Sequence, residues 1–312
     1  MIRVTIVGAG HYARSIVARK YAECPRCSLR SVISPRAMPA ALLETPLAGL
    51  PLARGAAEWR EQHGEPDVHD LFDLCVHPAV LLPALRSLVE IGARLFVLPK
   101  PLATTQAGLD AIRAVLRDCG ARVAVASQWH YSQVTAAVRE ATAQLARPLR
   151  IEMDFSQRFE PSQLERYTPR TALLPHMLQI LHTAGLWCPD EKDWIVRHGS
   201  PTHFRAEITT TRCGSKILLN TDIDSVDRRR VVTVMDTTGH RIEADFLGVF
   251  HNGVPAKYPA VVIDGHREDI TEDNIAVMVR HEIAGFLDAA PYLDLDGYLP
   301  VNDMLLLLGS HL

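Results

Sequence analysis

The sequence predicts an α/β protein in which an N-terminal doubly wound parallel sheet is followed by a C-terminal α+β domain with an open, mostly antiparallel sheet. Strand and helix patterns alternate through the first part of the chain, which is typical of right-handed crossovers in a parallel sheet. After about residue 127, short strands follow one another with turn signals between them, which is typical of antiparallel sheet. We therefore expect two domains, over 1–126 and 127–312.

Each element of the first domain has its own signal. Helices 79–91 and 105–119 carry apolar residues at helical spacing and close at Gly92 and Gly120, because glycine readily takes the conformation that ends a helix. The short apolar runs between them predict buried strands. The expected strands are 4–7, 29–33, 72–76, 94–98 and 122–126, and a further helix begins near 13.

The second domain begins with a bridging helix from 131 to about 145. Residues 213–215 and 236–239 are typical hairpin turns, so the strands around them are predicted to be antiparallel. The expected strands are 149–155, 204–211, 216–222, 230–235 and 241–246, and the expected helices are 172–186, 274–289 and 302–308.

Composition excludes several classes of protein. The chain has 312 residues, 47% hydrophobic and 22% charged, which suits a globular protein of two domains. A net charge of -3 argues against a nucleic-acid partner. A core strand directly after Met1 leaves no room for a signal peptide, and no apolar run could cross a bilayer, so we expect a cytoplasmic protein. The six cysteines are scattered and are expected to be unpaired thiols.

The first strand leads into the turn Gly8-Ala9-Gly10-His11-Tyr12-Ala13. Gly8 permits a tight turn, Gly10 lets the backbone approach a pyrophosphate, and Ala13 lets the following helix pack close to the strand. The amides at the helix start, near His11 and Tyr12, form an anion site together with the helix dipole. This pattern predicts a Rossmann domain that binds a dinucleotide.

Cofactor choice is read at the end of the second strand, where NAD enzymes place an acid on the ribose hydroxyl. Here the residues are Ile33-Ser34-Pro35-Arg36, without an acid. Ser34 can donate to a 2′-phosphate and Arg36 can neutralise it, so NADP(H) is favoured over NAD(H). The alternative is a plain turn with an exposed arginine.

Lys100 lies between Pro99 and Pro101 at the end of a predicted strand. Each proline fixes its own φ and restricts the residue before it, so the lysine is held rigidly. Ligands bind at the carboxyl ends of strands in such sheets, where a lysine can orient a hydroxyl or carbonyl and move a proton. A solvated loop lysine is the alternative.

Together with these motifs, His77-Pro78 after a strand and Leu174-Pro175-His176 on a later helix resemble the glucose–fructose oxidoreductase/inositol dehydrogenase (Gfo/Idh/MocA) family over essentially the whole chain. The resemblance implies a Rossmann domain joined to a substrate and oligomerisation domain with an open sheet. It also implies that Lys100 and His176 flank the carbon that exchanges hydride with the nicotinamide, and that His77 and Pro78 lie at the cofactor.

Several positions depart from the family pattern. Pro99 replaces the glutamate of Glu-Lys-Pro, and Ala79 and Leu82 stand where Asn and His are usual. The acids around the histidine are replaced by Ala172 and Gln179. A proton relay through those acids is therefore not expected in this chain.

One branch of the family reduces a C=N bond of thiazoline-containing intermediates in secondary metabolism and often has a His-Tyr pair near the start of the bridging helix. This chain has Trp129-His130-Tyr131, and a tyrosine can act as a general acid. That branch tends to replace the lysine that this chain keeps as Lys100, and Tyr131 can equally be a core aromatic. Trp129, His130 and Gln179 are the predicted substrate-binding residues.

Other polar motifs have simpler interpretations. Asp294-x-Asp296-Gly297 lacks ligands that a calcium loop needs, and His182 lies six residues from His176, a spacing unsuited to a helical metal pair, so no metal site is predicted. The run 228–230, three arginines, is interpreted as the charged end of a hairpin.

The sequence thus predicts an NADP(H)-dependent oxidoreductase acting on a C–O or C–N carbon of a small polar metabolite. An imine reductase with Tyr131 as acid, or a non-catalytic NADP-binding sensor or scaffold, are the alternatives. The open sheet is expected to be covered in a homodimer or homotetramer. The predicted catalytic residues are Lys100, His176 and Tyr131, and the predicted cofactor-binding residues are Gly8, Gly10, His11, Tyr12, Ala13, Ser34, Arg36, His77, Pro78 and Lys100.

Overall fold

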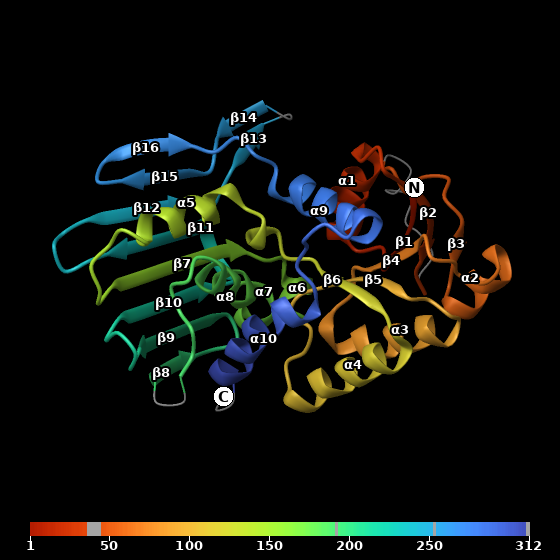
Figure 1. Cartoon of the computed structure of the whole chain (residues 1–312), viewed down its shortest axis with the longest axis horizontal. Helices are drawn as coiled ribbons and strands as arrows, with labels where there is room; N and C mark the ends of the chain where they lie inside the picture. The colour runs from red at the N-terminus through yellow and green to blue at the C-terminus, as the bar shows by residue number, and fades with distance from the viewer. Residues whose placement is uncertain (36–44, 191–192, 252–253, 310–312) are drawn as a thin grey trace. The chain divides into compact units, whose positions relative to one another are not determined.

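The computed structural model describes residues 1–35, 45–190, 193–251 and 254–309 and divides the chain into two compact units (Figure 1). The first unit combines Met1–Gln128 with Ile275–Leu299, and the second combines Trp129–Asn274 with the chain from Pro300 onward. The expected division fell between 126 and 127, and nothing in the sequence indicated that a C-terminal segment joins the first unit. A helix pattern shows which residues are buried, but it does not show which sheet buries them.

The first unit contains a six-stranded sheet with the order β3-β2-β1-β4-β5-β6, in which every pair is parallel. The strand order reverses between β1 and β4, which places the topological switch point there. All positions of β4 and β5 are buried, as expected for a parallel sheet covered on both faces. The strands are β1 (Ile2–Val7), β2 (Cys27–Ile33), β3 (Leu52–Ala53), β4 (Asp70–Leu74), β5 (Leu95–Leu98) and β6 (Arg122–Val125).

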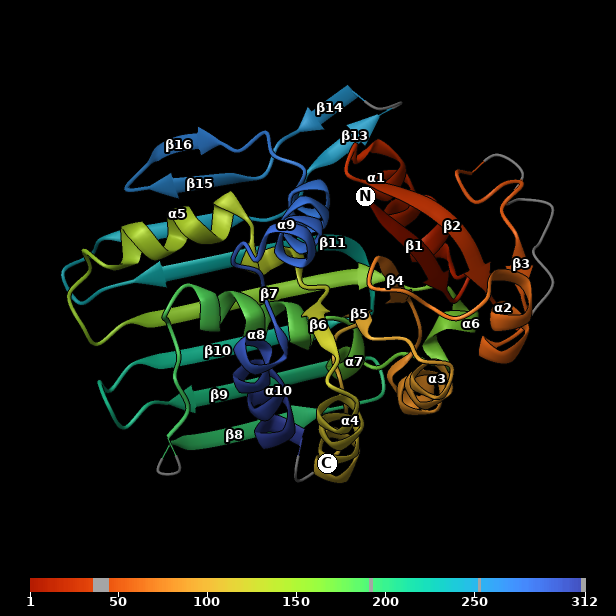
Figure 2. The ribbon, with the colours of Figure 1, turned by 45° about the vertical axis from the view of Figure 1, so that its right-hand side comes forward.

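Helices cover both faces of this sheet (Figures 1 and 2). Side chains alternate along a strand, so Phe72 and Asp73 of β4 point to opposite faces. Phe72 packs on Trp59 of α2, with 5.0 Å between ring centroids, whereas Asp73 accepts a hydrogen bond from Tyr21 of α1. The helices are η1 (Ala13–Val17), α1 (Ala18–Glu23) and α9 (Asn274–Asp288) on one face, and α2 (Ala56–His63), α3 (Pro78–Glu90) and α4 (Gln106–Cys119) on the other.

Hydrogen bonds tie the C-terminal segment to the first unit. Arg122 at the start of β6 donates to the carbonyls of Phe286 and Gly285 at 3.0 and 2.8 Å. The Val125 amide donates to the Leu293 carbonyl at 2.9 Å. These bonds fix the end of α9 and the chain after it against the edge strand.

The second unit contains an eight-stranded sheet with the order β16-β15-β12-β11-β7-β10-β9-β8. Only the pair β7 and β10 is parallel among the described strands of this sheet, so the prediction of a mostly antiparallel sheet is confirmed. The strands are β7 (Arg150–Arg158), β8 (Trp194–Gly199), β9 (His203–Thr209), β10 (Lys216–Asp222), β11 (Asp224–Met235), β12 (Arg241–Asp245), β15 (Ala260–Ile263) and β16 (His266–Asp269), with a separate pair β13 (Val249–His251) and β14 (Val254–Lys257).

One face of this sheet carries the core of the second unit, and helices α5 and α8 lie over it (Figure 2). Along β7, Ile151, Met153 and Phe155 are buried, while Glu152 and Asp154 on the other face are partly exposed. Every residue of α8 from Leu174 to Leu181 is buried. The helices are η3 (Gln128–His130), α5 (Gln133–Thr142), α6 (Pro161–Leu164), α7 (Pro169–Ala172), α8 (Leu174–Thr183) and the part of α10 (Leu295–Gly309) that begins at Pro300.

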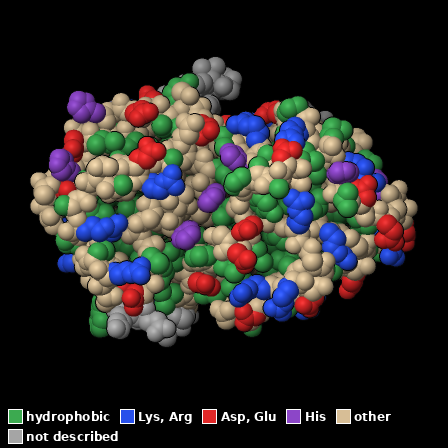
Figure 3. Space-filling view, in the orientation of Figure 1, with side chains coloured by type: hydrophobic (Ala, Val, Ile, Leu, Met, Phe, Trp, Pro, Cys, Tyr) green, Lys and Arg blue, Asp and Glu red, His purple; other side chains and the backbone are tan. Residues whose placement is uncertain are grey.

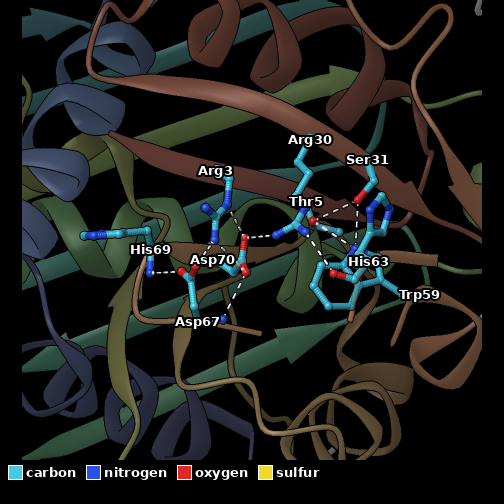
Figure 4. A network of polar contacts seen from close by, with 9 residues as sticks. All are labelled: Arg3, Thr5, Arg30, Ser31, Trp59, His63, Asp67, His69 and Asp70. Carbon is cyan, nitrogen blue, oxygen red and sulfur yellow. Dashed lines mark hydrogen bonds and ion pairs between the residues drawn. The ribbon is translucent and has the colours of Figure 1, made fainter. Parts of the chain in front are cut away.

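A polar network joins Arg3 near the start of β1, Arg30 in the middle of β2 and Asp70 at the start of β4 (Figure 4). Arg3 donates to the Asp70 carboxylate at 2.8 Å, and Arg30 also binds that carboxylate. Burial acts to raise the pKa of Asp70, but hydrogen bonds from Arg3, the Asp67 amide and Arg30 outweigh it and lower the pKa. The network therefore keeps a buried charge paired, at the edge of the sheet opposite to the carboxyl ends of the strands.

Charges of both signs are interspersed over the face shown in Figure 3. In the part of the chain that the structure describes, no helix is both long and apolar enough to traverse a lipid bilayer.

Candidate functional site

Four of the predicted cofactor residues lie along the carboxyl edge of the first sheet. Gly8, Ser34, His77 and Lys100 each follow the end of a strand, and the four strands β2, β1, β4 and β5 are consecutive neighbours in the sheet. Gly8 and His77 stand on the two sides of the switch point between β1 and β4. The structure thus brings residues that are far apart in sequence onto one edge, where open α/β sheets bind ligands.

The two glycines of the first turn have different surroundings. Gly8 has φ +100°, and a Cβ added there would lie 2.6 Å from the carbonyl oxygen of Cys75, so only glycine fits. At Gly10 an added Cβ would meet nothing within 4 Å. Gly8 therefore packs the turn against the end of β4, while Gly10 borders open space that a pyrophosphate can occupy.

The helix after the turn begins with exposed residues and is π-helical in its middle. His11 and Tyr12 are exposed, Ala13 is buried, and the Arg14 amide donates to the Gly10 carbonyl at 3.1 Å. The π-helical turn η1 precedes α1, and such turns are frequent at functional sites. Ala13 lies where the predicted fingerprint needs a small residue against the sheet.

At the end of β2, Ser34 is buried and its amide donates to the Ala53 carbonyl at 2.9 Å. Arg36, the second residue on which the NADP(H) prediction depends, lies outside the described residues. The choice between the two nucleotides stays a prediction.

His77 and Lys100 are both held by their local backbone. His77 caps α3, and its Nδ1 accepts the Ala79 amide at 3.2 Å, while Pro78 occupies the first position of the helix. Because Nδ1 accepts, the proton of the neutral ring lies on Nε2. Lys100 is half-buried between its two prolines, two residues after the end of β5, and the Lys100–Pro101 peptide bond is cis.

Sequence reasoning missed a buried acidic cluster beneath this edge. Tyr21 donates to Asp73 at 3.0 Å, and the Cys75 thiol donates to the other oxygen of Asp73 at 3.5 Å. Burial raises the pKa of Asp73 to about 6. Burial, and then the charge of Asp73, raise the pKa of Glu282 on α9, whose carboxyl oxygens have no hydrogen-bond partner among the described residues. An acid within the apolar strand Phe72-Asp73-Leu74 was the available signal.

In the second unit, His176 and Trp129 are brought together. The Trp129 Nε1 donates to His176 Nδ1 at 2.5 Å, and both side chains are buried. Indole N–H can only donate, so Nδ1 must accept, and the ring is neutral with its proton on Nε2. The indole thereby fixes both the orientation and the tautomer of the histidine.

Two further side chains surround the Trp129 indole. Phe246 packs edge-on at 5.2 Å between centroids, and the Arg230 guanidinium lies 5.8 Å from the ring centroid. Arg230 also donates to Gln157 at 3.1 Å. The interpretation of 228–230 as the charged end of a hairpin was therefore wrong for Arg230, because β11 extends from Asp224 to Met235 and its alternation turns this side chain towards the core face.

The remaining predicted substrate residues lie nearby in sequence or on α8. His130 and Tyr131 are both half-buried, and their rings pack edge-on with 4.9 Å between centroids. Gln179 is fully buried and its Nε2 donates to Thr183 at 2.7 Å. Their roles stay predictions. Within the described ranges, no three His, Cys, Asp or Glu side chains converge as metal ligands.

Comparison with known proteins identifies the fold. No protein-family model and no curated sequence matches the chain. Among solved structures, it is similar to UDP-N-acetylglucosamine 3-dehydrogenase GnnA from Acidithiobacillus ferrooxidans, with TM-score 0.76 and 16% identity over 99% of this chain and 97% of that one. It is also similar to KijD10, a 3-ketoreductase from Actinomadura kijaniata in complex with TDP-benzene and NADP, with TM-score 0.77 and 15% identity over the same shares.

A third similar structure is aldose-aldose oxidoreductase from Caulobacter crescentus, with TM-score 0.71 and 14% identity over 99% of this chain and 97% of that one. The chain has the fold of these oxidoreductases. At this level of identity the likeness covers both units and extends to the architecture alone.

Proposed function

We propose that the protein is an NADP(H)-dependent oxidoreductase that transfers hydride between the nicotinamide and a C–O or C–N carbon of a small polar metabolite. The observation that carries the proposal is the carboxyl edge of the first sheet, where the Gly8–Gly10 turn, His77 and Lys100 follow strands on both sides of the switch point. The similar structures support it, since two of them are named as a dehydrogenase and a ketoreductase and one was solved with NADP.

The residues of the first unit suit a dinucleotide. The open space at Gly10 leaves room for a pyrophosphate, and the amides at His11 and Tyr12 begin the helix that would face it. Ser34 would lie at the ribose that carries the 2′-phosphate. When bound, the nicotinamide supplies or accepts the hydride, and the protein supplies binding, orientation and protons.

Lys100 and His176 are assigned different tasks. Because Trp129 occupies His176 Nδ1, the neutral imidazole presents Nε2–H, which can donate a hydrogen bond to a substrate oxygen or nitrogen but cannot act as a base. The lysine ammonium can both donate a hydrogen bond and release its proton. We therefore assign the proton transfer to Lys100 and the stabilisation of developing negative charge to His176.

Nucleotide binding tests the proposal directly. When the purified chain is titrated with NADPH and with NADH, we expect both nucleotides to bind, and we expect the dissociation constant to be lower for NADPH. Ser34→Asp should reverse the preference, because an acid repels the 2′-phosphate. Binding of neither nucleotide would overturn the proposal.

Two variants separate the proposed chemistry from its alternatives. With NADPH and a panel of carbonyl and imine compounds, Lys100→Ala is expected to reduce turnover at least a hundredfold, whereas Tyr131→Phe should leave it within threefold. The opposite pattern would favour imine reduction with Tyr131 as the acid. Tight NADPH binding without oxidation by any compound would instead favour a sensor.

A further inference from the structure

Arg230 is a charged side chain on the core face of the second sheet, and no carboxylate among the described residues pairs with it. Its Nη2 donates to the neutral Gln157 at 3.1 Å, and its Nε is buried with no hydrogen-bond partner among the residues that the structure describes. Burial, and then the charge of the neighbouring Arg228, lower the pKa of Arg230 to about 10. The guanidinium is still charged at neutral pH, so the unit contains a partly desolvated cation.

Such an arrangement destabilises the folded protein. An unpaired ion that loses its water costs several kcal/mol, and buried polar groups otherwise nearly always find partners. Asp70, by contrast, is a buried charge that is paired with both Arg3 and Arg30. A buried arginine that has no carboxylate partner is expected at a binding site whose ligand supplies the negative charge.

The position of Arg230 relative to His176 indicates that the anion belongs to the substrate. Both side chains contact the same indole: Arg230 lies over the Trp129 ring, and His176 accepts a hydrogen bond from its Nε1. The Arg230 guanidinium carbon lies 5.8 Å and the His176 ring centroid 6.0 Å from the centroid of the Trp129 ring, so an anion bound to Arg230 would lie beside the indole that positions the histidine. Side-on binding through Nε–H and one Nη suits the two oxygens of a carboxylate or a phosphate.

We propose that Arg230 binds an anionic group of the substrate, a carboxylate or a phosphate, close to the carbon that exchanges hydride. This inference rests on the proposed function and narrows its substrates to compact anionic carbonyl or imine compounds. Arg230 is then a binding and specificity residue, and Trp129 positions it together with His176.

Anion binding can be measured without knowing the substrate. Inorganic phosphate and propionate are titrated separately, with glycerol as an uncharged control, while the 15N–1H signal of the Arg230 Nε–H group is followed by NMR and calorimetry gives the dissociation constant. Arg230→Gln is expected to weaken binding of the preferred anion at least tenfold. The anion that binds more tightly identifies the group as carboxylate or phosphate.

Arg229→Gln is the matched control. Arg229 is adjacent on β11 but pairs with Asp154 on the opposite face at 3.5 Å, so its loss should leave anion binding within twofold. Equal effects of the two variants, or no effect of Arg230→Gln, would overturn the proposal.

A purely structural Arg230 gives a different result in a stability measurement. Arg230→Met keeps most of the volume and removes the unpaired charge, so its melting temperature should equal or exceed that of the wild type while anion binding is lost. A lower melting temperature with unchanged anion binding would show that the arginine only supports Trp129, and would overturn the proposal.

NADPH titration of the same samples separates this inference from the proposed function. If NADPH binds but neither anion does, the assignment of Arg230 fails while the oxidoreductase proposal stands. If neither nucleotide binds, the proposed function fails, and with it the assignment of a bound anion to a substrate.

Discussion

Two buried aspartates on β4 are predicted to respond to pH in opposite directions. Asp73 and Asp70 lie three residues apart and are both almost fully buried. Burial raises the pKa of Asp73 from its usual 3.8 to about 6, whereas the hydrogen bonds from Arg3, Asp67 and Arg30 overcome burial and lower the pKa of Asp70. Asp73→Asn and Asp70→Asn therefore form a matched pair of perturbations.

The sign for Asp73 follows from proton linkage. Between pH 3.8 and about 6 the folded state binds more protons at this site than the unfolded state, so stability is lost as the pH rises through this window. At pH 8 the ionised carboxylate destabilises the first unit by about 3 kcal/mol, since each pKa unit corresponds to about 1.4 kcal/mol. Asparagine removes that penalty but weakens one hydrogen bond, worth about 1 kcal/mol. We expect Asp73→Asn to be about 2 kcal/mol more stable than wild type at pH 8 and about 1 kcal/mol less stable near pH 4.

Asp70 should behave in the opposite way. Its folded pKa is depressed, so its contribution is present above the unfolded pKa and lost as the pH falls through the folded value. Asp70→Asn is expected to lose about 2 kcal/mol at pH 8, because charged hydrogen bonds are broken, and the difference should shrink in acid.

The stability of the first unit can be measured by unfolding in urea, followed by hydrogen exchange of peptides from β4. Each variant is compared with the wild type at the same pH, so that the intrinsic pH dependence of the exchange rate cancels. The reasoning is refuted if Asp73→Asn is less stable than wild type by the same amount at pH 4 and pH 8, since Asp73 would then titrate normally.

Two further predictions concern the cofactor turn and the histidine. Gly10→Ala should leave the melting temperature unchanged but weaken NADPH binding about tenfold or more. Gly8→Ala should instead lower the free energy of unfolding by about 1–3 kcal/mol, because its Cβ would strike a backbone carbonyl at positive φ. Calorimetry measures the affinity and thermal melts measure the stability, and a Gly10→Ala chain with wild-type affinity would contradict the proposed cofactor site. Trp129→Phe should remove the preference for one tautomer of His176. The 15N NMR spectrum is then expected to show a mixture of the Nδ1–H and Nε2–H tautomers, where the wild type shows Nε2–H alone, and an unchanged spectrum would contradict the assigned role of the indole.

Local patterns were sufficient to predict most of the fold. The period and closing glycines of the helices now seen as α3 and α4 set their limits within a residue or two, and the predicted strand 216–222 coincides with β10 (Lys216–Asp222). These features depend on neighbouring residues, so the sequence contains them. The parallel pairing of β7 with β10 depends on which strands meet in space, and no local signal encodes it.

The candidate site was predictable where motifs lie directly after strands, as for Gly8, His77 and Lys100. The contacts that support His176 and Trp129 could not be predicted from the sequence. The bond from Trp129 to His176 joins residues 47 positions apart, and Arg230 looked like a surface residue because its neighbours in sequence are charged. A side chain's partner across a fold has no fixed sequence spacing, so such contacts require the three-dimensional arrangement.

The first unit is interrupted in sequence, and this has a consequence for how the protein is made. α9 places Val277, Met278, Ile283 and Phe286 in the core, and Arg26 at the other end of the chain binds Asp288. A nascent chain that has left the ribosome only as far as residue 128 still lacks one wall of the first unit. That half can be completed only after the whole of the second sheet has been translated, so the two halves mature together rather than one after the other.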